Sequence, residues 1–185
     1  RKKGKKEDIF MKKTILAAAA LGAATLSMAA PVMAEGDYKV AMVTDSGDIT
    51  DQSFNQTTYE ACKAFCEENG LDFNYYKPDG DSDEARIASC DQAIADGYNI
   101  LVLPGYLFAA SVVEESPVYP DVKFIALDMS EADLTGAAGV DDVTQAYNTE
   151  NTYCAIYQEE IPGYMAGYAA VKMGYKHLGF LGGMS

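Results

Sequence analysis

Three side chains with complementary hydrogen-bonding and stacking chemistry follow the first apolar run of the chain. Residues 38–43, YKVAMV, predict a β-strand, and Asp45 comes just after it. Phe54 and Asn55 open the helical stretch that follows a turn containing Gly47. A carboxylate accepts hydrogen bonds, an amide both donates and accepts them, and an aromatic ring offers a flat face. Their order along the chain predicts that all three line one ligand-binding crevice.

Two further residues extend this pattern at the ends of later apolar runs. Gly105 follows residues 99–104 and opens the third helical stretch, where free backbone N–H groups can meet ligand oxygens. Asp128 ends residues 122–128 and repeats the placement of Asp45. Because the carboxyl ends of parallel strands meet at one edge of a sheet, two such acids favour a crevice there.

Each of these residues also has a purely structural interpretation. Phe54 could be a core residue of the first helix, with Asp51 or Ser53 as the N-cap. Asp45 could cap the helix that follows it, and Gly105 could serve only to turn the chain. The sequence leaves these alternatives open.

The elements that must position these residues alternate along the chain. Several predicted strands are nearly continuous apolar runs, which is typical of a parallel sheet covered by helices on both faces. Glycine follows Asn69 and Asp96, where the first two helices are expected to end. We therefore predict an α/β fold with a doubly wound parallel sheet. The expected strands are residues 38–44, 71–76, 99–104, 122–128 and 136–140, and the expected helices are residues 53–69, 83–96 and 107–116.

The pattern changes after the last of these strands. A polar stretch, residues 141–151, precedes a helix expected over residues 159–173 and a further strand expected over residues 177–181. We interpret residues 35–145 as an N-terminal ligand-binding lobe. Residues 146–185 would then be a crossover helix and the first strand of a second lobe, in a C-terminally truncated fragment of a longer protein.

An export signal is predicted near the start of the chain. Residues 11–34 combine two lysines, an apolar run that is short for a membrane span, and a small-residue cleavage site at Val32-Met33-Ala34. The first cysteine of the chain is Cys62, so a lipid anchor has no attachment point near the cleavage site. Residues 1–10 are interpreted as upstream read-through. The mature protein is expected to begin near Glu35, outside the cytoplasm.

The charge of the predicted mature chain restricts its partners. Residues 35–185 hold seven basic and twenty-six acidic residues, a net charge of −19. Such a surface repels a phosphate backbone, so nucleic acid and anionic lipid are poor partners. An acidic surface also keeps an exported protein soluble, which accounts for the charge without any partner.

The four cysteines do not predict a disulfide framework. Cys62 and Cys66 lie one helical turn apart, where both side chains leave the helix in parallel. Cys90 falls in the next predicted helix, Cys154 lies far along the chain, and His177 is the only histidine. We expect small buried hydrophobic side chains and no metal site, while a bridge between the first two helices stays open.

Residues 43–56, VTDSGDITDQSFNQ, resemble the opening of the basic membrane protein family, the substrate-binding proteins of bacterial ABC importers for purine nucleosides. Residues 38–184 as a whole are similar to this family. The resemblance implies a type I periplasmic-binding-protein fold, in which two α/β lobes close over a ligand. The other matching stretches are residues 103–107, 119–128, 165–170 and 179–184.

For a member of this family, the resemblance assigns Asp45, Phe54 and Asn55 to the base. Phe54 would stack on the ring, while Asp45 and Asn55 would bond its edge. Gly105 and Asp128 would belong to the same site. The implied partners are a purine nucleoside and a membrane permease, and no cofactor is expected.

Two other classes of function stay open. A sugar or another small polar metabolite could occupy the same site, because aromatic stacking with acid and amide contacts also suits a pyranose ring. An exported enzyme could use the same fold. Against an enzyme, no GxSxG, P-loop, GxGxxG or metal-ligand cluster follows a predicted strand.

Overall fold

The computed structural model describes residues 37–182. The chain divides into two units, Arg1–Asp37 and Tyr38–Ser185, and the second contains all the elements described below. The predicted signal peptide, residues 11–34, and the preceding ten residues lie outside the described part of the chain. Among the described helices, none has the length and apolar character needed to cross a membrane.

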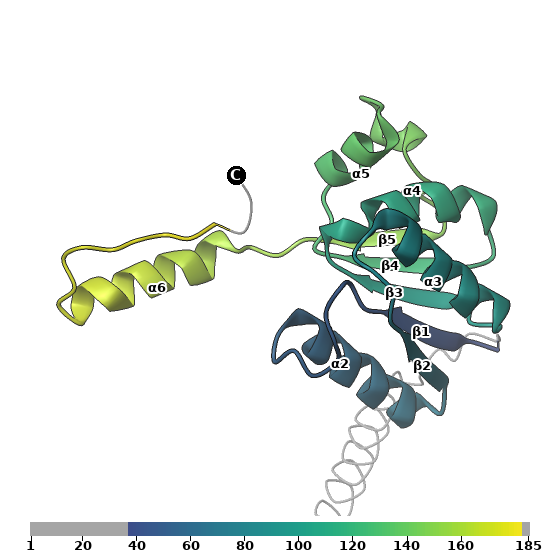
Figure 1. The fold of residues 1–185 in the computed structure, drawn as a ribbon, viewed down its shortest axis with the longest axis horizontal. Coiled ribbons are helices and arrows are strands. Elements are labelled where there is room, and N and C mark those ends of the chain that lie inside the picture. Colours follow the sequence, from purple (N-terminus) through teal and green to yellow (C-terminus); the bar gives the residue numbers. More distant parts are fainter. Residues whose placement is uncertain (1–36, 183–185) are drawn as a thin grey trace, which may run out of the picture. The chain divides into compact units, whose positions relative to one another are not determined.

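A five-stranded sheet forms the centre of the lobe (Figure 1). The strands are β1 (Lys39–Val43), β2 (Asp72–Tyr76), β3 (Ile100–Pro104), β4 (Lys123–Leu127) and β5 (Thr152–Ala155). Their order is β2-β1-β3-β4-β5, and every neighbouring pair is parallel. The predicted parallel α/β fold is confirmed.

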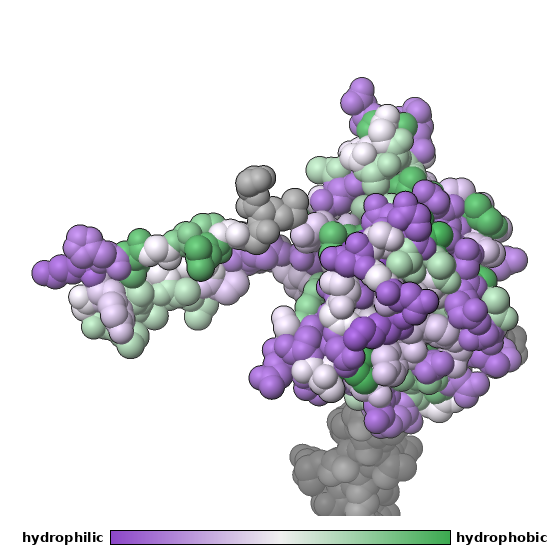
Figure 2. All heavy atoms as spheres, in the orientation of Figure 1, coloured by the Kyte–Doolittle hydropathy of each residue, from purple (hydrophilic) through white to green (hydrophobic). Residues whose placement is uncertain are grey.

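Helices cover both faces of this sheet, as the doubly wound prediction requires. Helix α2 lies against one face, while α3 and α4 lie against the other (Figure 1). Helix α6 has no buried residue, and apolar side chains are exposed along it (Figure 2). The α-helices are α2 (Phe54–Asn69), α3 (Asp83–Ala95), α4 (Ala109–Val118), α5 (Glu131–Ala138) and α6 (Glu160–Lys172), with short 3-10 helices η1 (Tyr106–Phe108) and η2 (Val143–Gln145).

Side chains alternate between the two faces of the sheet along each strand, and this divides the core into two clusters. Val40 and Met42 pack with Cys66 on the α2 face of the sheet. Leu101 and Leu103 belong to the cluster on the opposite face, among side chains from α3 and α4. Successive side chains of a strand point to opposite faces, so an apolar run of five residues supplies both cores.

Two predicted strands are wrong. Residues 136–140 form the end of α5 and its cap, because the side chains and backbones of Ser130 and Asp133 make a reciprocal capping box and Leu134 anchors the helix in the core. The fifth strand is β5, which pairs with β4, so the sheet extends past residue 145, the predicted end of the first lobe.

The other strand, predicted over residues 177–181, is likewise not present in the described chain. A strand needs a neighbouring strand to satisfy its backbone hydrogen bonds, and no described strand pairs with this segment. The remainder of the domain division, including the start of a second lobe, stays a prediction.

Two of the four cysteines are buried, as the packing prediction expects. All four are free thiols, which excludes the bridge left open between the first two helices. Cys66 and Cys90 are buried, while Cys62 and Cys154 are half-buried. Burial raises the pKa of Cys62 to about 11, so this thiol is protonated at neutral pH. No cluster of potential metal ligands occurs within residues 37–182.

Candidate functional site

The carboxyl edge of the sheet brings together the residues that the sequence singled out. Asp45, Gly105 and Asp128 follow β1, β3 and β4, which are neighbours in the sheet. Phe54 is the first residue of α2, the helix that returns from the same edge. The predicted grouping is therefore present, while a binding role for these residues stays a prediction.

A hydrogen-bond network organises the loop between β1 and α2. The Asp45 Oδ1 atom accepts from the Gly47 N–H at 2.6 Å and from Asn55 Nδ2 at 2.8 Å. In return, the Asp45 N–H donates to Asn55 Oδ1 at 3.2 Å. The carboxylate that follows β1 is thereby tied to the first turn of α2.

Asp51 caps the start of α2 from the same loop. Its carboxylate accepts from the N–H groups of Ser53, Asn55 and Gln56 at 2.8–3.2 Å, and from Asn55 Nδ2 at 3.0 Å. Burial alone would raise the pKa of Asp51, but these hydrogen bonds outweigh it and hold the pKa below its usual value. Of the two caps that the sequence allowed, Asp51 supplies the hydrogen bonds and Ser53 supplies none from its side chain.

Gly47 is required by the close packing of this loop. A Cβ atom at this position would lie 2.6 Å from Asn55 Nδ2 and 2.9 Å from Asp45 Oδ1. Both distances are shorter than real Cβ contacts, and both atoms belong to the network. The glycine in the first predicted motif therefore permits a close approach.

Strained backbone lies at the same edge of the sheet. Gln52 and Asp128 are the two non-glycine residues with positive φ within residues 37–182, each at 55°. Left-handed conformations are unfavourable for side chains with a Cβ, and they are concentrated at functional sites. Both positions lie in loops that follow strands β1 and β4.

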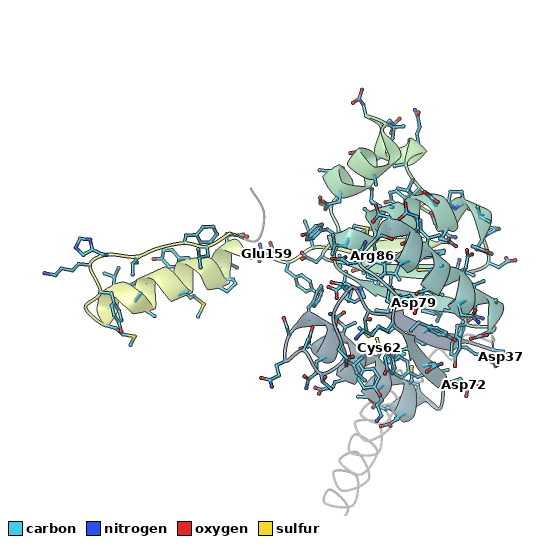
Figure 3. All side chains as sticks on the ribbon, viewed as in Figure 1. Asp37, Cys62, Asp72, Asp79, Arg86 and Glu159 are labelled. Atoms are coloured by element: carbon cyan, nitrogen blue, oxygen red, sulfur yellow. The ribbon has the colours of Figure 1, made fainter. Side chains whose placement is uncertain are left out.

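Asp128 also has an electrostatic environment that separates it from Asp45. Its N–H donates to the Ala155 carbonyl at 2.7 Å, which ties the end of β4 to β5. Burial and the nearby Glu159 carboxylate, in the segment between β5 and α6 (Figure 3), raise the pKa of Asp128. The two acids predicted for the edge are both present. The Asn55 amide lies between Asp45 and its neighbour Asp51, whereas the Glu159 carboxylate raises the pKa of Asp128.

Gly105 has a conformation that requires glycine. Its φ is 113°, and it precedes η1. Its N–H donates to the Leu127 carbonyl at 2.8 Å, so this amide serves the sheet. The structural interpretation of Gly105 as a turn thus has direct support, and a ligand contact by this residue stays a prediction.

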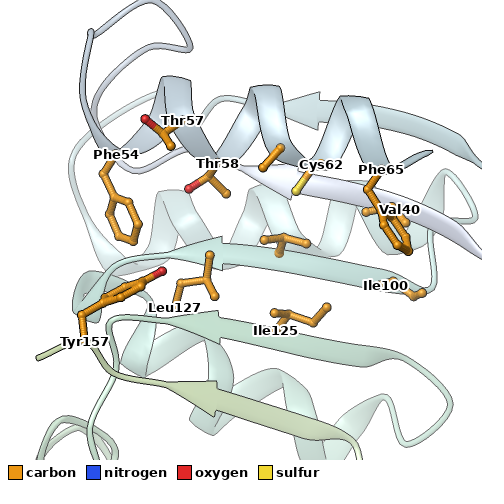
Figure 4. Close-up of a pocket in the computed structure, with 12 residues that line it drawn as sticks. Val40, Phe54, Thr57, Thr58, Cys62, Phe65, Ile100, Ile125, Leu127 and Tyr157 are labelled. Carbon is orange, nitrogen blue, oxygen red and sulfur yellow. The ribbon is translucent and has the colours of Figure 1, made fainter. Parts of the chain in front are cut away.

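Phe54 lies beside an aromatic residue that the sequence analysis did not identify. The rings of Phe54 and Tyr157 are edge to face, with centroids 6.1 Å apart and an interplanar angle of 81° (Figure 4). Tyr157 comes from the segment after β5, more than a hundred residues away in the chain. No local motif marks it, so only the fold could have revealed it.

An apolar groove runs along the sheet from this aromatic pair (Figure 4). It has a volume of about 540 Å³ and lies between α2 and buried or half-buried side chains of β1, β3 and β4. The side chains that line the groove offer few hydrogen-bonding groups, so the groove suits hydrophobic side chains better than a polar metabolite. The lining residues are Val40, Phe54, Thr57, Thr58, Ala61, Cys62, Phe65, Ile100, Val102, Ile125, Leu127 and Tyr157.

Comparisons with known proteins agree with this architecture. A model of the Bmp family, ABC transporter substrate-binding protein PnrA-like, matches residues 38–185. The crystal structure of a solute-binding protein of an ABC transporter system from Aeropyrum pernix K1 has a TM-score of 0.53 and 22% identity, over 75% of this chain and 35% of that chain. At that identity the likeness concerns the fold alone.

Three curated relatives are similar over part of their length. The ABC transporter nucleoside-binding protein BmpA of Lactococcus lactis is 25% identical over 189 residues, 94% of this chain and 49% of that protein. A CD4+ T-cell-stimulating antigen of Listeria monocytogenes is 29% identical over 97 residues, 50% of this chain and 27% of that protein. An uncharacterised lipoprotein of Pyrococcus abyssi is 27% identical over 146 residues, 79% and 33% of the two chains.

The chain spans about half the length of the first of these relatives and less of the others. What it covers is a parallel α/β lobe with acidic and aromatic side chains at the carboxyl edge of the sheet. The family match extends over this whole lobe. The chain therefore belongs to the Bmp family of PnrA-like ABC transporter substrate-binding proteins.

Proposed function

We propose that this protein binds a neutral nucleoside at the carboxyl edge of its sheet and delivers it to the permease of an ABC importer. The observation that carries this proposal is the pairing of an aromatic face, Phe54, with a fixed carboxylate, Asp45, at the edge where parallel sheets bind ligands. A planar base needs a face to stack on and an acceptor for its N–H groups. The relative from Lactococcus lactis is described as nucleoside-binding, which supports the same ligand class.

The charge of the edge favours a nucleoside over a nucleotide. Asp45, Asp51, Asp128 and Glu159 gather there, and Lys77 is already paired with Asp48 at 2.9 Å. A phosphate would be repelled by this group of carboxylates, whereas N–H and O–H donors of a neutral ligand would find acceptors. The acidic edge therefore selects against phosphorylated forms of the same ligand.

Delivery to a permease implies a location outside the cytoplasm. The family consists of ABC transporter substrate-binding proteins, and a relative from Pyrococcus abyssi is a lipoprotein. In this chain, residues 11–34 have the pattern of a signal peptide. We infer export with cleavage after Ala34, and N-terminal sequencing of the exported protein tests this.

A titration with inosine, guanosine, ribose and galactose tests the ligand. One lobe presents only part of a closed cleft, so we expect weak binding, and NMR titration suits that range. Phe54→Ala should weaken nucleoside binding by about 1–3 kcal/mol through lost stacking. Asp45→Ala should cost about 1.5–3 kcal/mol, because a donor of the base loses a charged acceptor.

The matched control is Phe65→Ala, which removes an exposed ring from the far end of the same helix and should leave affinity unchanged. Sugar binding stronger than nucleoside binding would favour the alternative of a sugar or another polar metabolite. Nucleoside affinity that survives both Phe54→Ala and Asp45→Ala would place the ligand elsewhere.

A further inference from the structure

The side chain of Asn55 has a partner for each of its polar groups. Its Nδ2 atom donates to Asp45 Oδ1 at 2.8 Å and to Asp51 Oδ2 at 3.0 Å, which uses both amide hydrogens. Its Oδ1 atom accepts from the Asp45 N–H at 3.2 Å. The residue is only 3% exposed. A ligand at the edge would therefore find no hydrogen-bond donor on Asn55.

The orientation of this amide follows from its neighbours. Rotating the amide by half a turn would place its carbonyl oxygen against two carboxylate oxygens and its NH₂ group against the Asp45 N–H. All three contacts would then be repulsive. The observed orientation is the one in which every contact joins a donor to an acceptor. The pKa of the Asp51 carboxyl is lowered, so this group remains an acceptor at neutral pH.

We propose that Asn55 is a positioning residue that acts through Asp45 and does not itself contact the ligand. This inference rests on the proposed function, in which Asp45 accepts a hydrogen bond from the base. The link runs from Asp51, through the Asn55 amide, to one oxygen of the Asp45 carboxylate.

The network determines which oxygen of Asp45 is offered to a ligand. Oδ1 already accepts from Gly47 and Asn55, while no hydrogen bond within residues 37–182 uses Oδ2. A carboxylate held in this way presents one oxygen in one direction. That arrangement suits a ligand with an N–H in the plane of a ring, such as the N1–H of inosine. Purine riboside lacks this hydrogen and therefore cannot donate a hydrogen bond to the Asp45 carboxylate.

A double-mutant cycle tests the proposal. Inosine is titrated by NMR against the unmodified 185-residue chain, Asp45→Ala, Asn55→Ala and the double variant. We expect Asn55→Ala to weaken binding about tenfold when Asp45 is present, and by less than about twofold in the Asp45→Ala background. Purine riboside should bind all four proteins with nearly the same affinity. Additive losses would show that Asn55 contacts the ligand itself, and an unchanged affinity in Asn55→Ala would show a role in stability alone; either result overturns the proposal.

Asn151→Ala provides a matched control for the loss of a buried asparagine. Asn151 is also 3% exposed, and its amide donates to the carbonyls of Ser116 and Tyr119 at 2.9 and 3.0 Å, just before β5 and thus at the opposite edge of the sheet. The Asn151→Ala substitution should lower the stability of the protein without changing the affinity of the folded protein for inosine. If Asn55→Ala does not fold, Asn55→Ser keeps one donor and replaces it in the cycle.

A measurement without ligand separates this inference from the proposed function. The Gly47 N–H donates to the oxygen that Asn55 holds, so its amide hydrogen exchange should accelerate about tenfold in Asn55→Ala and stay unchanged in Asn151→Ala. A chain that binds no nucleoside defeats the proposed function. Unchanged exchange at Gly47 in Asn55→Ala defeats the positioning role, whether or not nucleoside binds.

Discussion

The loop between β1 and α2 and the interface between α3 and α4 treat their buried polar groups in opposite ways. In the loop, the amide of the buried Asn55 has a partner for each of its polar atoms. At the interface, Glu115 is 4% exposed and its Oε2 atom has no hydrogen-bond partner. The neighbouring hydroxyl of Ser111, fully buried, has no partner better than the weakly polar thiol of Cys90.

Hydrogen bonding holds the loop in one geometry, whereas unpaired polar groups at the interface between α3 and α4 lower the stability of the fold. A buried hydrogen bond contributes about 1 kcal/mol, whereas an unpaired buried polar group costs about 1–3 kcal/mol. The pairing in the loop therefore contributes rigidity at the candidate site. The unpaired groups at the interface lower stability where no ligand residue is predicted.

The largest expected effect comes from the pH dependence of Glu115. Burial first, and then the negative charge of Asp91, raise its pKa from 4.5 to about 7. The folded state thus favours the protonated acid, so the stability that Glu115 contributes is full below pH 4.5 and is lost as the pH rises through 7. Glu115→Gln removes this loss. Urea unfolding should show the variant gaining on the order of 2 kcal/mol relative to the unmodified protein between pH 4.5 and pH 8.

The control for this pH dependence is Glu114→Gln, an exposed neighbour on the same helix. We expect it to change stability by less than about 0.5 kcal/mol at either pH. A difference between Glu115→Gln and the unmodified protein that does not vary with pH would contradict the assignment of a raised pKa to Glu115.

The next largest effect tests the packing of the loop between β1 and α2. Gly47→Ala places a methyl group 2.6 Å from Asn55 Nδ2, so the network must open to admit it. We expect a loss of about 1–2 kcal/mol in unfolding free energy, measured by urea denaturation. Gly80→Ala is the control, because no heavy atom lies within 4 Å of a Cβ there. If the two variants are equally stable, the loop is not as tightly packed as its contacts indicate.

The smallest effect compares two serines on α4 that are both fully buried. Ser116 Oγ accepts from the Asn148 N–H at 3.0 Å, whereas the Ser111 hydroxyl lacks such a partner. Ser116→Ala should lose about 1 kcal/mol because it leaves that N–H without an acceptor. Ser111→Ala should be neutral or stabilising by up to about 1 kcal/mol. Thermal unfolding of the pair measures the difference, and the reverse order would remove the contrast between paired and unpaired groups.

The strands and helices that could be predicted are those with strong local patterns. Residues 38–44 and 99–104 are apolar runs bounded by polar residues, and they became β1 and β3. Residues 136–140 combine glycine, alanine and valine, which suit several conformations, and there the capping of α5 by Ser130 and Asp133 decided the outcome. A local pattern predicts an element well only when no competing helix cap or tertiary contact overrides it.

The sequence by itself determined that a parallel α/β sheet would place Asp45, Gly105 and Asp128 along one edge with Phe54 beside them. This follows from strand order and direction, which depend on apolar runs and on the length of the connections. Only the tertiary structure decided that Asn55 is turned inward and fully paired, and that Tyr157 meets Phe54. Hydrogen-bond partners and ring contacts depend on side-chain orientation across loops and across a hundred residues of chain, which the order of amino acids does not display.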